Sequence, residues 1–226
     1  MSLPHLHIPA VVDGFILAGG QSRRMGHDKA LTLLAGVPLV QHASNLLRSA
    51  GLEPRIAGAK SDLSSIAPTL PDDPNQSSLG PLSGICSALA NSSAPRALFL
   101  PVDLPLLPAS LIGYLIHHAT VAQSAVTVVS VAGFIQTFPA IIDTAALPSL
   151  QSSLNSNDRN SLRAFRAAAD ILSRPFSVLP VELLLQAGQV SSPQALPPGV
   201  WFLNINTPQD LLQAEALLAG RHVQVI

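Results

Sequence analysis

The segment 17–29 holds the residues of this chain that are best suited to phosphate chemistry, and it reads LAGGQSRRMGHDK. Gly19 and Gly20 carry no side chains, so backbone N–H groups there can closely approach phosphate oxygens. Three positive charges follow within seven residues, from Arg23, Arg24 and Lys29. Arginine offers a planar fork of donors, and lysine offers a mobile point charge. The segment therefore predicts a loop that binds a polyphosphate.

Two common phosphate-binding loops do not fit this spacing. The P-loop needs Gly-Lys-Ser/Thr in direct succession, whereas Lys29 stands three residues after Gly26. The dinucleotide fingerprint needs glycines at its first, third and sixth positions, which these glycines do not occupy. A turn with a solvated basic face is the simplest alternative, and the charged residues that follow the glycines favour phosphate binding over it.

Asp103 is the candidate metal ligand. It follows residues 97–102, an apolar run that predicts a buried strand. A carboxylate at the end of such a strand suits Mg²⁺, which usually binds one or two carboxylates together with waters and phosphate oxygens. Asp103 could instead cap a helix near Pro108, but a separation of five residues makes a direct cap awkward.

The elements around these residues predict an α/β fold, a single Rossmann-like three-layer sandwich in which helices cover a mostly parallel sheet. The expected strands are 11–17, 55–58, 97–102, 125–131 and 135–142, and the expected helices are 38–49, 81–90, 108–119 and 161–169. Ligands of parallel sheets bind at the carboxyl ends of the strands. Segment 17–29 and Asp103 should therefore meet at one edge.

The rest of the chain is less regular. Residues 186–199, rich in Gln, Ser and Pro, predict a surface loop, and residues 201–204 predict a strand. No linker is long enough to force a domain boundary. We therefore expect one domain over 1–226, with residues 1–10 as a flexible terminus.

Composition excludes several classes of protein. Of the 226 residues, 48% are apolar and 11% are charged, which argues against disorder, and the net charge of −1 argues against nucleic acid as a partner. Cys86 is the only cysteine, which suits a reducing compartment. No signal-peptide pattern and no run of about eighteen apolar residues occurs. We expect a cytoplasmic protein that does not bind membranes.

The segment 17–29 resembles the corresponding loop of the molybdenum cofactor guanylyltransferases, whose pattern reads Leu-Ala-Gly-Gly-x-Ser-x-Arg-Met-Gly-x-Asp-Lys. The resemblance spans about residues 11–219 and implies the nucleotide-diphospho-sugar transferase fold. It also implies that the loop wraps GTP through Leu17, Ala18, Gly19, Gly20 and Lys29. Relatives that use CTP tend to carry alanine where Gly19 stands, so the glycine pair favours GTP.

The resemblance implies that Asp73 lies in the guanosine site. The family has an acidic residue before a Gly-Pro-Leu-x-Gly segment, and GPLSG stands at 80–84 here. A carboxylate can accept hydrogen bonds from guanine N1–H and the 2-amino group, which cytosine or adenine cannot match in the same geometry. Binding to the ribose, and an ordinary turn over 72–75, are the alternatives.

The carboxyl-terminal segment 202–211 resembles a family segment that faces the active site and the pterin acceptor. Asn204 and Asn206 precede a predicted helix start with Thr207 as N-cap, followed by Pro208 and Asp210. Amide groups beside a positive helix end suit an anionic ligand, although the two asparagines could merely fix the turn.

Two arginines resemble residues at the family's Arg-Ser-Leu helix start, and they could bind the acceptor's phosphate or face solvent: Arg159 and Arg163. One departure bears on the base. Family members often have an asparagine near the nucleotide where Gly58 stands. Guanine selection is therefore less secure than phosphate binding.

Together these features predict an enzyme that transfers GMP from GTP to the phosphate of molybdopterin and releases pyrophosphate, with Mg²⁺ as cofactor. Lys29, with Arg23 or Arg24, would stabilise the phosphate charge. Molybdoenzymes or their chaperones are further candidate partners. The alternatives are a related enzyme that uses CTP or a sugar phosphate, and a non-catalytic chaperone for the molybdenum cofactor.

Overall fold

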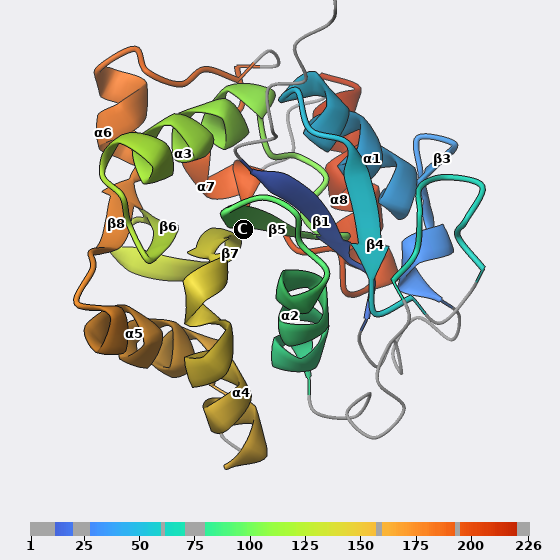
Figure 1. Ribbon diagram of the computed structural model, residues 1–226. Coiled ribbons are helices and arrows are strands. Elements are labelled where there is room, and N and C mark those ends of the chain that lie inside the picture. Colours follow the sequence, from blue (N-terminus) through green and yellow to red (C-terminus); the bar gives the residue numbers. More distant parts are fainter. Residues whose placement is uncertain are drawn as a thin grey trace, which may run out of the picture.

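The computed structural model describes residues 12–19, 28–59, 62–70, 80–156, 160–192 and 195–220 (Figure 1). Its strands are β1 (Asp13–Leu17), β2 (Leu33–Leu34), β3 (Val37–Pro38), β4 (Pro54–Ala57), β5 (Arg96–Pro101), β6 (Val126–Val131), β7 (Phe134–Asp143) and β8 (Phe176–Pro180). Its α-helices are α1 (Leu39–Ser49), α2 (Pro81–Ala90), α3 (Ala109–Val121), α4 (Leu147–Asn155), α5 (Ser161–Leu172), α6 (Val181–Gln186), α7 (Pro198–Trp201) and α8 (Pro208–Leu218). Two short 3₁₀ helices are η1 (Lys29–Leu31) and η2 (Thr144–Ala146).

The main sheet is mixed but mostly parallel, as the sequence predicts. Its strand order is β4-β1-β5-β7-β6-β8. The β1–β4, β1–β5 and β6–β8 pairs are parallel, whereas β7 runs antiparallel to both of its neighbours. Ala132 and Gly133, which join β6 to β7, have φ angles of 50° and 81°. Positive φ at both central residues is the geometry of a tight hairpin turn, which makes β6 and β7 antiparallel.

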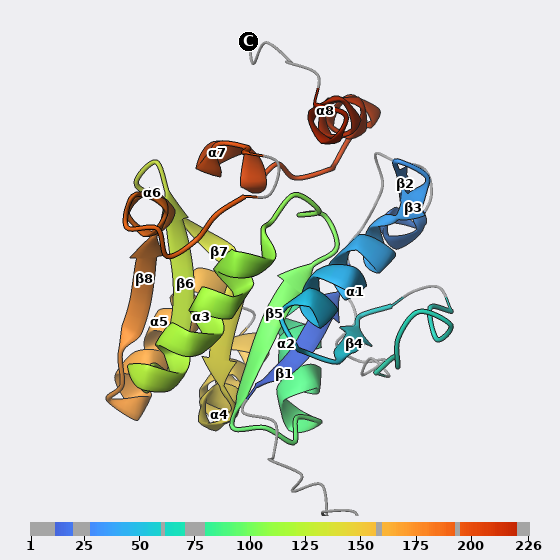
Figure 2. The ribbon, with the colours of Figure 1, turned by 90° about the horizontal axis from the view of Figure 1, so that it is seen from above.

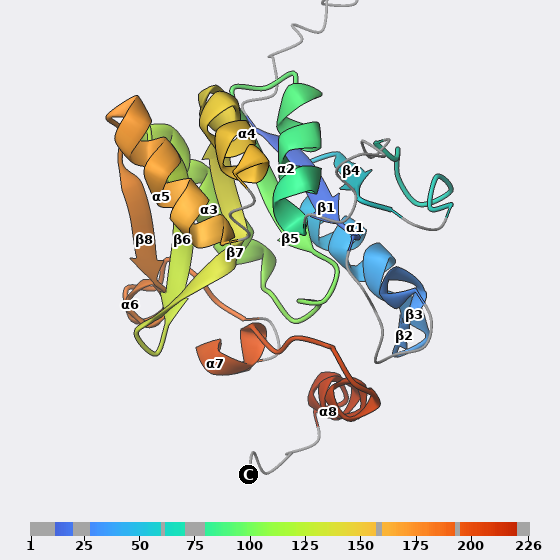
Figure 3. The same cartoon turned by 90° about the horizontal axis from the view of Figure 1, so that it is seen from below.

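Helices cover both faces of this sheet, in three layers. One apolar cluster joins the sheet to α1 and α3, and a second joins it to α2, α4 and α5. Figures 2 and 3 view these two faces from opposite sides. The face of α1 that packs on the sheet is apolar, because Leu39, Ala43 and Leu47 are buried in the first cluster. None of the described helices is long and apolar enough to cross a membrane.

The predictions after residue 186 need correction. The expected strand over 201–204 is wrong, because Trp201 belongs to α7 and residues 202–204 form a turn and an irregular segment. Trp201 is fully buried and donates its indole N–H to the Leu196 carbonyl at 2.7 Å. The apolar residues that suggested a strand therefore fill the core from a short helix. The predicted loop also ends early, because its last two residues belong to α7.

The carboxyl ends of β1 and β5 lie side by side, and we call this rim of the sheet the site edge. Leu17, the last residue of β1, pairs with Pro101 at the end of β5. In Figure 3, α2 and α5 both begin on the side of the sheet that is nearer to α7 and α8. The site edge therefore collects strand ends and helix starts from distant parts of the chain.

Candidate active site

Three polar side chains from distant segments meet at the site edge. The Lys29 Nζ atom lies 2.8 Å from Asp103 Oδ2 and 2.6 Å from Asn206 Oδ1. The Lys29 and Asp103 side chains keep 15% and 22% of their surface exposed, so solvent or a ligand can reach them. The structure thus brings together the predicted phosphate-binding lysine, the predicted metal ligand and one predicted acceptor residue.

The position of Lys29 is set by the short helix that it begins. Asp28 caps η1, since its Oδ1 accepts a hydrogen bond from the Ala30 N–H at 3.0 Å. Ala30 is completely buried in the core. This cap and this buried anchor fix the backbone on both sides of Lys29, so the lysine side chain starts from a defined point.

Asp103 is held by its backbone, which leaves its side chain at the edge. The Val102 N–H donates to the Leu17 carbonyl at 3.2 Å, and the Ile205 N–H donates to the Asp103 carbonyl at 3.1 Å. The alternative role for Asp103 is not observed, because Pro108 is the N-cap of α3 and no side chain caps that helix. Asp103 is therefore available for chemistry.

The described part of the glycine segment lies against the loop that follows β4. The Ala18 N–H donates to the Ala57 carbonyl at 2.9 Å. A Cβ atom on Gly19 would come within 3.2 Å of the Gly58 carbonyl oxygen, which is closer than most real contacts. Leu17 and Ala18 are buried, so any contribution from them to a ligand would come from the backbone. The close approach of the Gly58 carbonyl therefore favours glycine over larger residues at position 19.

Several predicted site residues lie outside the described part of the chain, and their roles stay predictions: Gly20, Arg23, Arg24, Asp73 and Arg159. Asn204 differs from Asn206. Its amide nitrogen lies 3.4 Å from the Phe202 carbonyl, a contact within its own turn. Asn206 contacts Lys29, whereas Asn204 contacts its own turn, so the two asparagines are not equivalent.

Arg163 lies beside a separate open depression. Its backbone N–H donates to the side chain of Asn160, which caps α5. The depression has a volume of about 670 Å³ and is lined by Pro81, Thr137, Phe138, Asn160, Ser161 and Leu162. Sequence reasoning did not identify this depression, although an asparagine just before Ser161 is a signal for a helix N-cap.

Asp210 lies close to the cluster on the side of α8. Burial raises the pKa of Asp210. Hydrogen bonds from Asn206 and Thr207 and the charge of Lys29 together outweigh that effect, so the pKa lies below the ordinary value of 3.8. Asp210 is therefore a carboxylate at neutral pH, and the charge of Lys29 faces both it and Asp103.

The residues present fit a Mg²⁺ ion that arrives with substrate. Within the described residues, no group of three or more His, Cys, Asp or Glu side chains comes together. Asp103 supplies one carboxylate, and Asn206, whose Oδ1 atom contacts the same Lys29 ammonium, supplies an amide oxygen. Mg²⁺ typically keeps several waters and binds one or two carboxylates together with substrate phosphates. These protein donors fit such a coordination, in which substrate phosphates and waters supply the remaining ligands.

The fold and the site edge define a class of nucleotide-binding transferase domains. The family model of the MobA-like NTP transferase domain matches residues 14–171. A structure of molybdopterin-guanine dinucleotide biosynthesis protein A from Archaeoglobus fulgidus superposes with a TM-score of 0.71 at 20% identity. That alignment covers 92% of this chain and 98% of the other, so the two share a fold.

Curated relatives define the family more closely. The molybdenum cofactor guanylyltransferase of Rhodobacter capsulatus is 32% identical over 90% of this chain and 95% of its own length. That of Xanthomonas euvesicatoria is 43% identical over 48% of this chain, a match that spans 57% of its own length. The chain belongs to the molybdenum cofactor guanylyltransferase family. The resemblance found in segment 17–29 is thereby confirmed.

Proposed function

We propose that this protein transfers GMP from GTP to the terminal phosphate of molybdopterin and releases pyrophosphate. The observation that carries the proposal is the meeting of Lys29 and Asp103 at 2.8 Å at the edge where β1 ends at Leu17. A cation and a metal-binding carboxylate at one point suit a reaction whose substrates carry many negative charges. Family membership supports the chemical class, and this pair of residues supports the proposed location of the active site.

The reaction needs no covalent enzyme intermediate. An oxygen of the acceptor's phosphate attacks the α-phosphorus of GTP, a new P–O bond forms, and the bond to the β-phosphate bridging oxygen breaks. Catalysis then consists mostly of positioning and charge neutralisation. The Lys29 ammonium would move from Asp103 to the phosphoryl oxygens as they gain charge, with Arg23 or Arg24 beside it.

Asp103 would hold Mg²⁺ once Lys29 no longer occupies its Oδ2 atom. Mg²⁺ supplies neutralisation of the phosphate charge when it is bound there. Asp73 would read the guanine base. These roles extend the family assignment to individual residues and remain part of the proposal.

The depression between α2 and α5 is the proposed seat of the acceptor. Both helices start there, and helix N-termini favour anions. Arg163 lies in the first turn of α5, and Arg159 precedes that helix in the sequence. Asn206, on the Lys29 side, would then stand between the nucleotide and the acceptor, with Asn204 two residues before it.

A pyrophosphate-release assay with Mg²⁺ and molybdopterin tests this function when GTP, CTP, UTP and ATP are compared. The proposal expects release with GTP above that with the other three nucleotides. Release mainly with CTP would instead identify a cytidylyltransferase, and activity with a sugar phosphate alone would change the acceptor. Cofactor binding without any pyrophosphate release would identify a chaperone that serves molybdoenzymes.

A further inference from the structure

The start of α8 holds Asn206 in place through a capping box. The Asp210 Oδ2 atom accepts hydrogen bonds from the N–H groups of Asn206 and Thr207, both at 2.8 Å. In return, the Thr207 hydroxyl oxygen accepts from the Asp210 N–H at 3.2 Å. The residue before Asn206 is also tied, since the Ile205 N–H donates to the Asp103 carbonyl. The backbone of Asn206 is thus fixed on both sides.

The side chain of Asn206 carries this order to the catalytic lysine. Its Oδ1 atom lies 2.6 Å from Lys29 Nζ, 177 residues away in the chain. A chain of three contacts therefore leads from the Asp210 carboxylate through Asn206 to the ammonium and on to Asp103. Asn206 and Asp210 lie beyond residue 171, where the match to the transferase domain model ends.

We infer that Asp210 is a positioning residue, which acts through Asn206 to hold the Lys29 ammonium at Asp103 before the nucleotide binds. An incoming triphosphate then meets a cation that is already at the site edge. This inference deepens the proposed function and rests on it for the catalytic consequence. The positioning itself is a property of the protein without ligand.

The simpler explanation is that Asp210 only stabilises α8. Thr207→Ala separates the two explanations, because it removes one half of the same capping box and leaves the contact between Asp210 Oδ2 and the Asn206 N–H. Asp210→Ala removes the other half together with that contact. Asp210→Glu should rescue the loss, because glutamate at this helix position also reaches back to the N-cap N–H and so keeps a carboxylate beside the adjacent Asn206 N–H.

The reactivity of the Lys29 amine in the ligand-free protein provides the first test. The chain has only two lysines, so Lys60 serves as an internal reference for brief acetylation followed by mass spectrometry. Relative to Lys60, labelling of Lys29 should rise roughly threefold in Asp210→Ala and in Asn206→Ala. It should stay near the wild-type ratio in Thr207→Ala and in Asp210→Glu.

Equal increases in Thr207→Ala and Asp210→Ala would show that only the helix cap matters, and would overturn the inference. An unchanged ratio in Asp210→Ala would overturn it as well. If circular dichroism shows that Asp210→Ala does not fold, Asp210→Asn takes its place. That variant keeps one oxygen but loses the charge, and a ratio identical to wild type in both it and Asn206→Ala would refute the inference.

Enzyme kinetics provide the second test. Asp210→Ala should lower kcat roughly three- to tenfold in the wild-type background. In an Asn206→Ala background it should have almost no further effect, because the contact through which it acts is gone. If the losses in kcat add up in the double variant, Asp210 does not act through Asn206, and the inference is refuted. If the wild-type protein releases no pyrophosphate with GTP, the proposed function fails, and the labelling result still decides the positioning role.

Discussion

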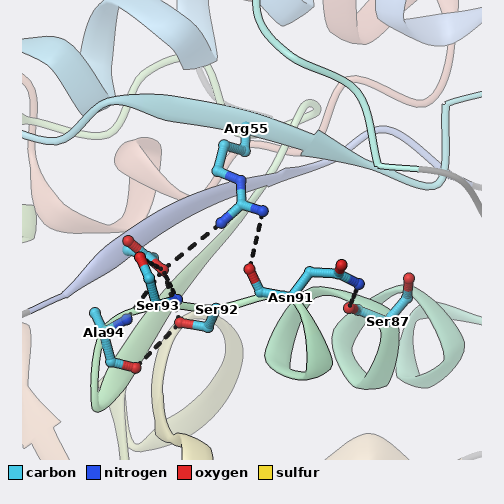
Figure 4. Close-up of polar contacts among 7 residues, drawn as sticks. Arg55, Ser87, Asn91, Ser92, Ser93 and Ala94 are labelled. Atoms are coloured by element: carbon cyan, nitrogen blue, oxygen red, sulfur yellow. Dashed lines mark hydrogen bonds and ion pairs between the residues drawn. The ribbon is translucent and has the colours of Figure 1, made fainter.

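The two rims of the main sheet, which lie at opposite ends of the strands, use similar polar residues in different ways. At the edge opposite the site, the Asp13 Oδ2 atom accepts hydrogen bonds from the Ser92 hydroxyl and the Ser93 N–H, both at 2.8 Å, and from the Ala94 N–H at 3.3 Å. Arg55 adds an ion pair at 3.7 Å and donates to the Asn91 carbonyl at 2.9 Å. Figure 4 shows Arg55 beside this turn between α2 and β5.

At the site edge, the carboxylate of Asp103 instead faces the end of a long side chain. This carboxylate pairs with Lys29 Nζ, which sits at the end of a flexible four-carbon side chain and can move without any change in the backbone. The partners of Asp13 include two backbone N–H groups of the turn, which cannot move unless the turn unfolds, together with the short Ser92 hydroxyl. A carboxylate held by backbone groups stabilises the fold, whereas one paired with a mobile cation can exchange that cation for a ligand.

The largest expected effect is that of removing the mobile cation. Lys29→Ala should lower kcat between about tenfold and a thousandfold, the range found when one donor to a developing negative charge is lost. The fold should survive, because Lys29 is an edge residue and Ala30 beside it remains buried. Steady-state kinetics and thermal melting measure the two effects. Full activity in this variant would show that Lys29 has no catalytic role, and the proposed difference between the two edges would then be wrong.

Asp103→Asn should have the next largest effect, a loss of about tenfold or more in kcat/KM together with a higher requirement for Mg²⁺. The amide keeps the shape of the side chain and loses the charge that would hold the ion. Titration of Mg²⁺ at fixed GTP measures the shift. Asp143→Asn is a control from the opposite edge, where Arg174 and Arg96 lie 2.8 Å and 3.9 Å from the carboxylate. That variant should lose stability and keep the wild-type Mg²⁺ dependence.

Much of the fold was predictable because it depends on local patterns. Helix α2 matches the prediction over 81–90, where Pro81 stands at the first helical position. The predicted cap of α8 is confirmed as well. The strand predicted at 201–204 failed because an apolar run cannot distinguish a buried strand from a buried helical turn. β8 and α6 were not predicted.

The site was predictable only in part. Segment 17–29 leads to the prediction that Lys29 binds phosphate, and the apolar run before Asp103 to the prediction that Asp103 lies at the same edge. Their direct contact, and the arrival of Asn206 from 177 residues away, depend on tertiary packing that no local pattern encodes. The different contacts of Asn204 and Asn206 could not be predicted either, because both residues fit the same motif.

A third prediction concerns stability at the opposite edge. Asp13→Ala should lower the free energy of unfolding by about 2 kcal/mol at pH 7, the scale of hydrogen bonds to a charged group. The kcat should remain within about twofold of wild type, since the turn lies far from the site edge along the strands. Urea denaturation measures the loss. Asp62→Ala, which removes an exposed turn carboxylate, should leave the free energy of unfolding nearly unchanged.

The same carboxylate predicts a pH dependence. Burial raises the pKa of Asp13, but hydrogen bonds from Ser92, Ser93 and Ala94 and the charge of Arg55 outweigh it, so the pKa lies below the ordinary 3.8. A group with a depressed folded-state pKa stabilises the protein above its unfolded-state pKa. That contribution should be complete above about pH 5 and disappear as pH falls through the folded-state value. The stability gap between wild type and Asp13→Ala should therefore narrow below pH 3.8; a gap that widens there would contradict the assignment.

The smallest expected effect is that of Gly19→Ala. This variant tests whether nucleotide binding depends on the exact position of the backbone at the site edge. The added Cβ of Gly19→Ala would lie 3.2 Å from the Gly58 carbonyl oxygen and 3.5 Å from its Cα, so the two loops must separate by a few tenths of an ångström. A movement of the Lys29 side chain would displace one phosphate donor, whereas a shift of the backbone would displace all the donors of the loop together. We expect KM for GTP to rise roughly threefold with little change in kcat, since ground-state and transition-state binding weaken alike.

Gly84→Ala is the matched control, because its Cβ would meet Leu17 Cδ2 at 3.7 Å and Ala57 Cβ at 4.0 Å, which are ordinary contacts. It adds the same methyl group on the helix beside β1, where alanine is favoured over glycine by about 1 kcal/mol. Gly84→Ala should therefore melt at a higher temperature with KM unchanged. If both variants raise KM equally, crowding near β1 in general is responsible, and the close approach of Gly19 to Gly58 has no special role in nucleotide binding.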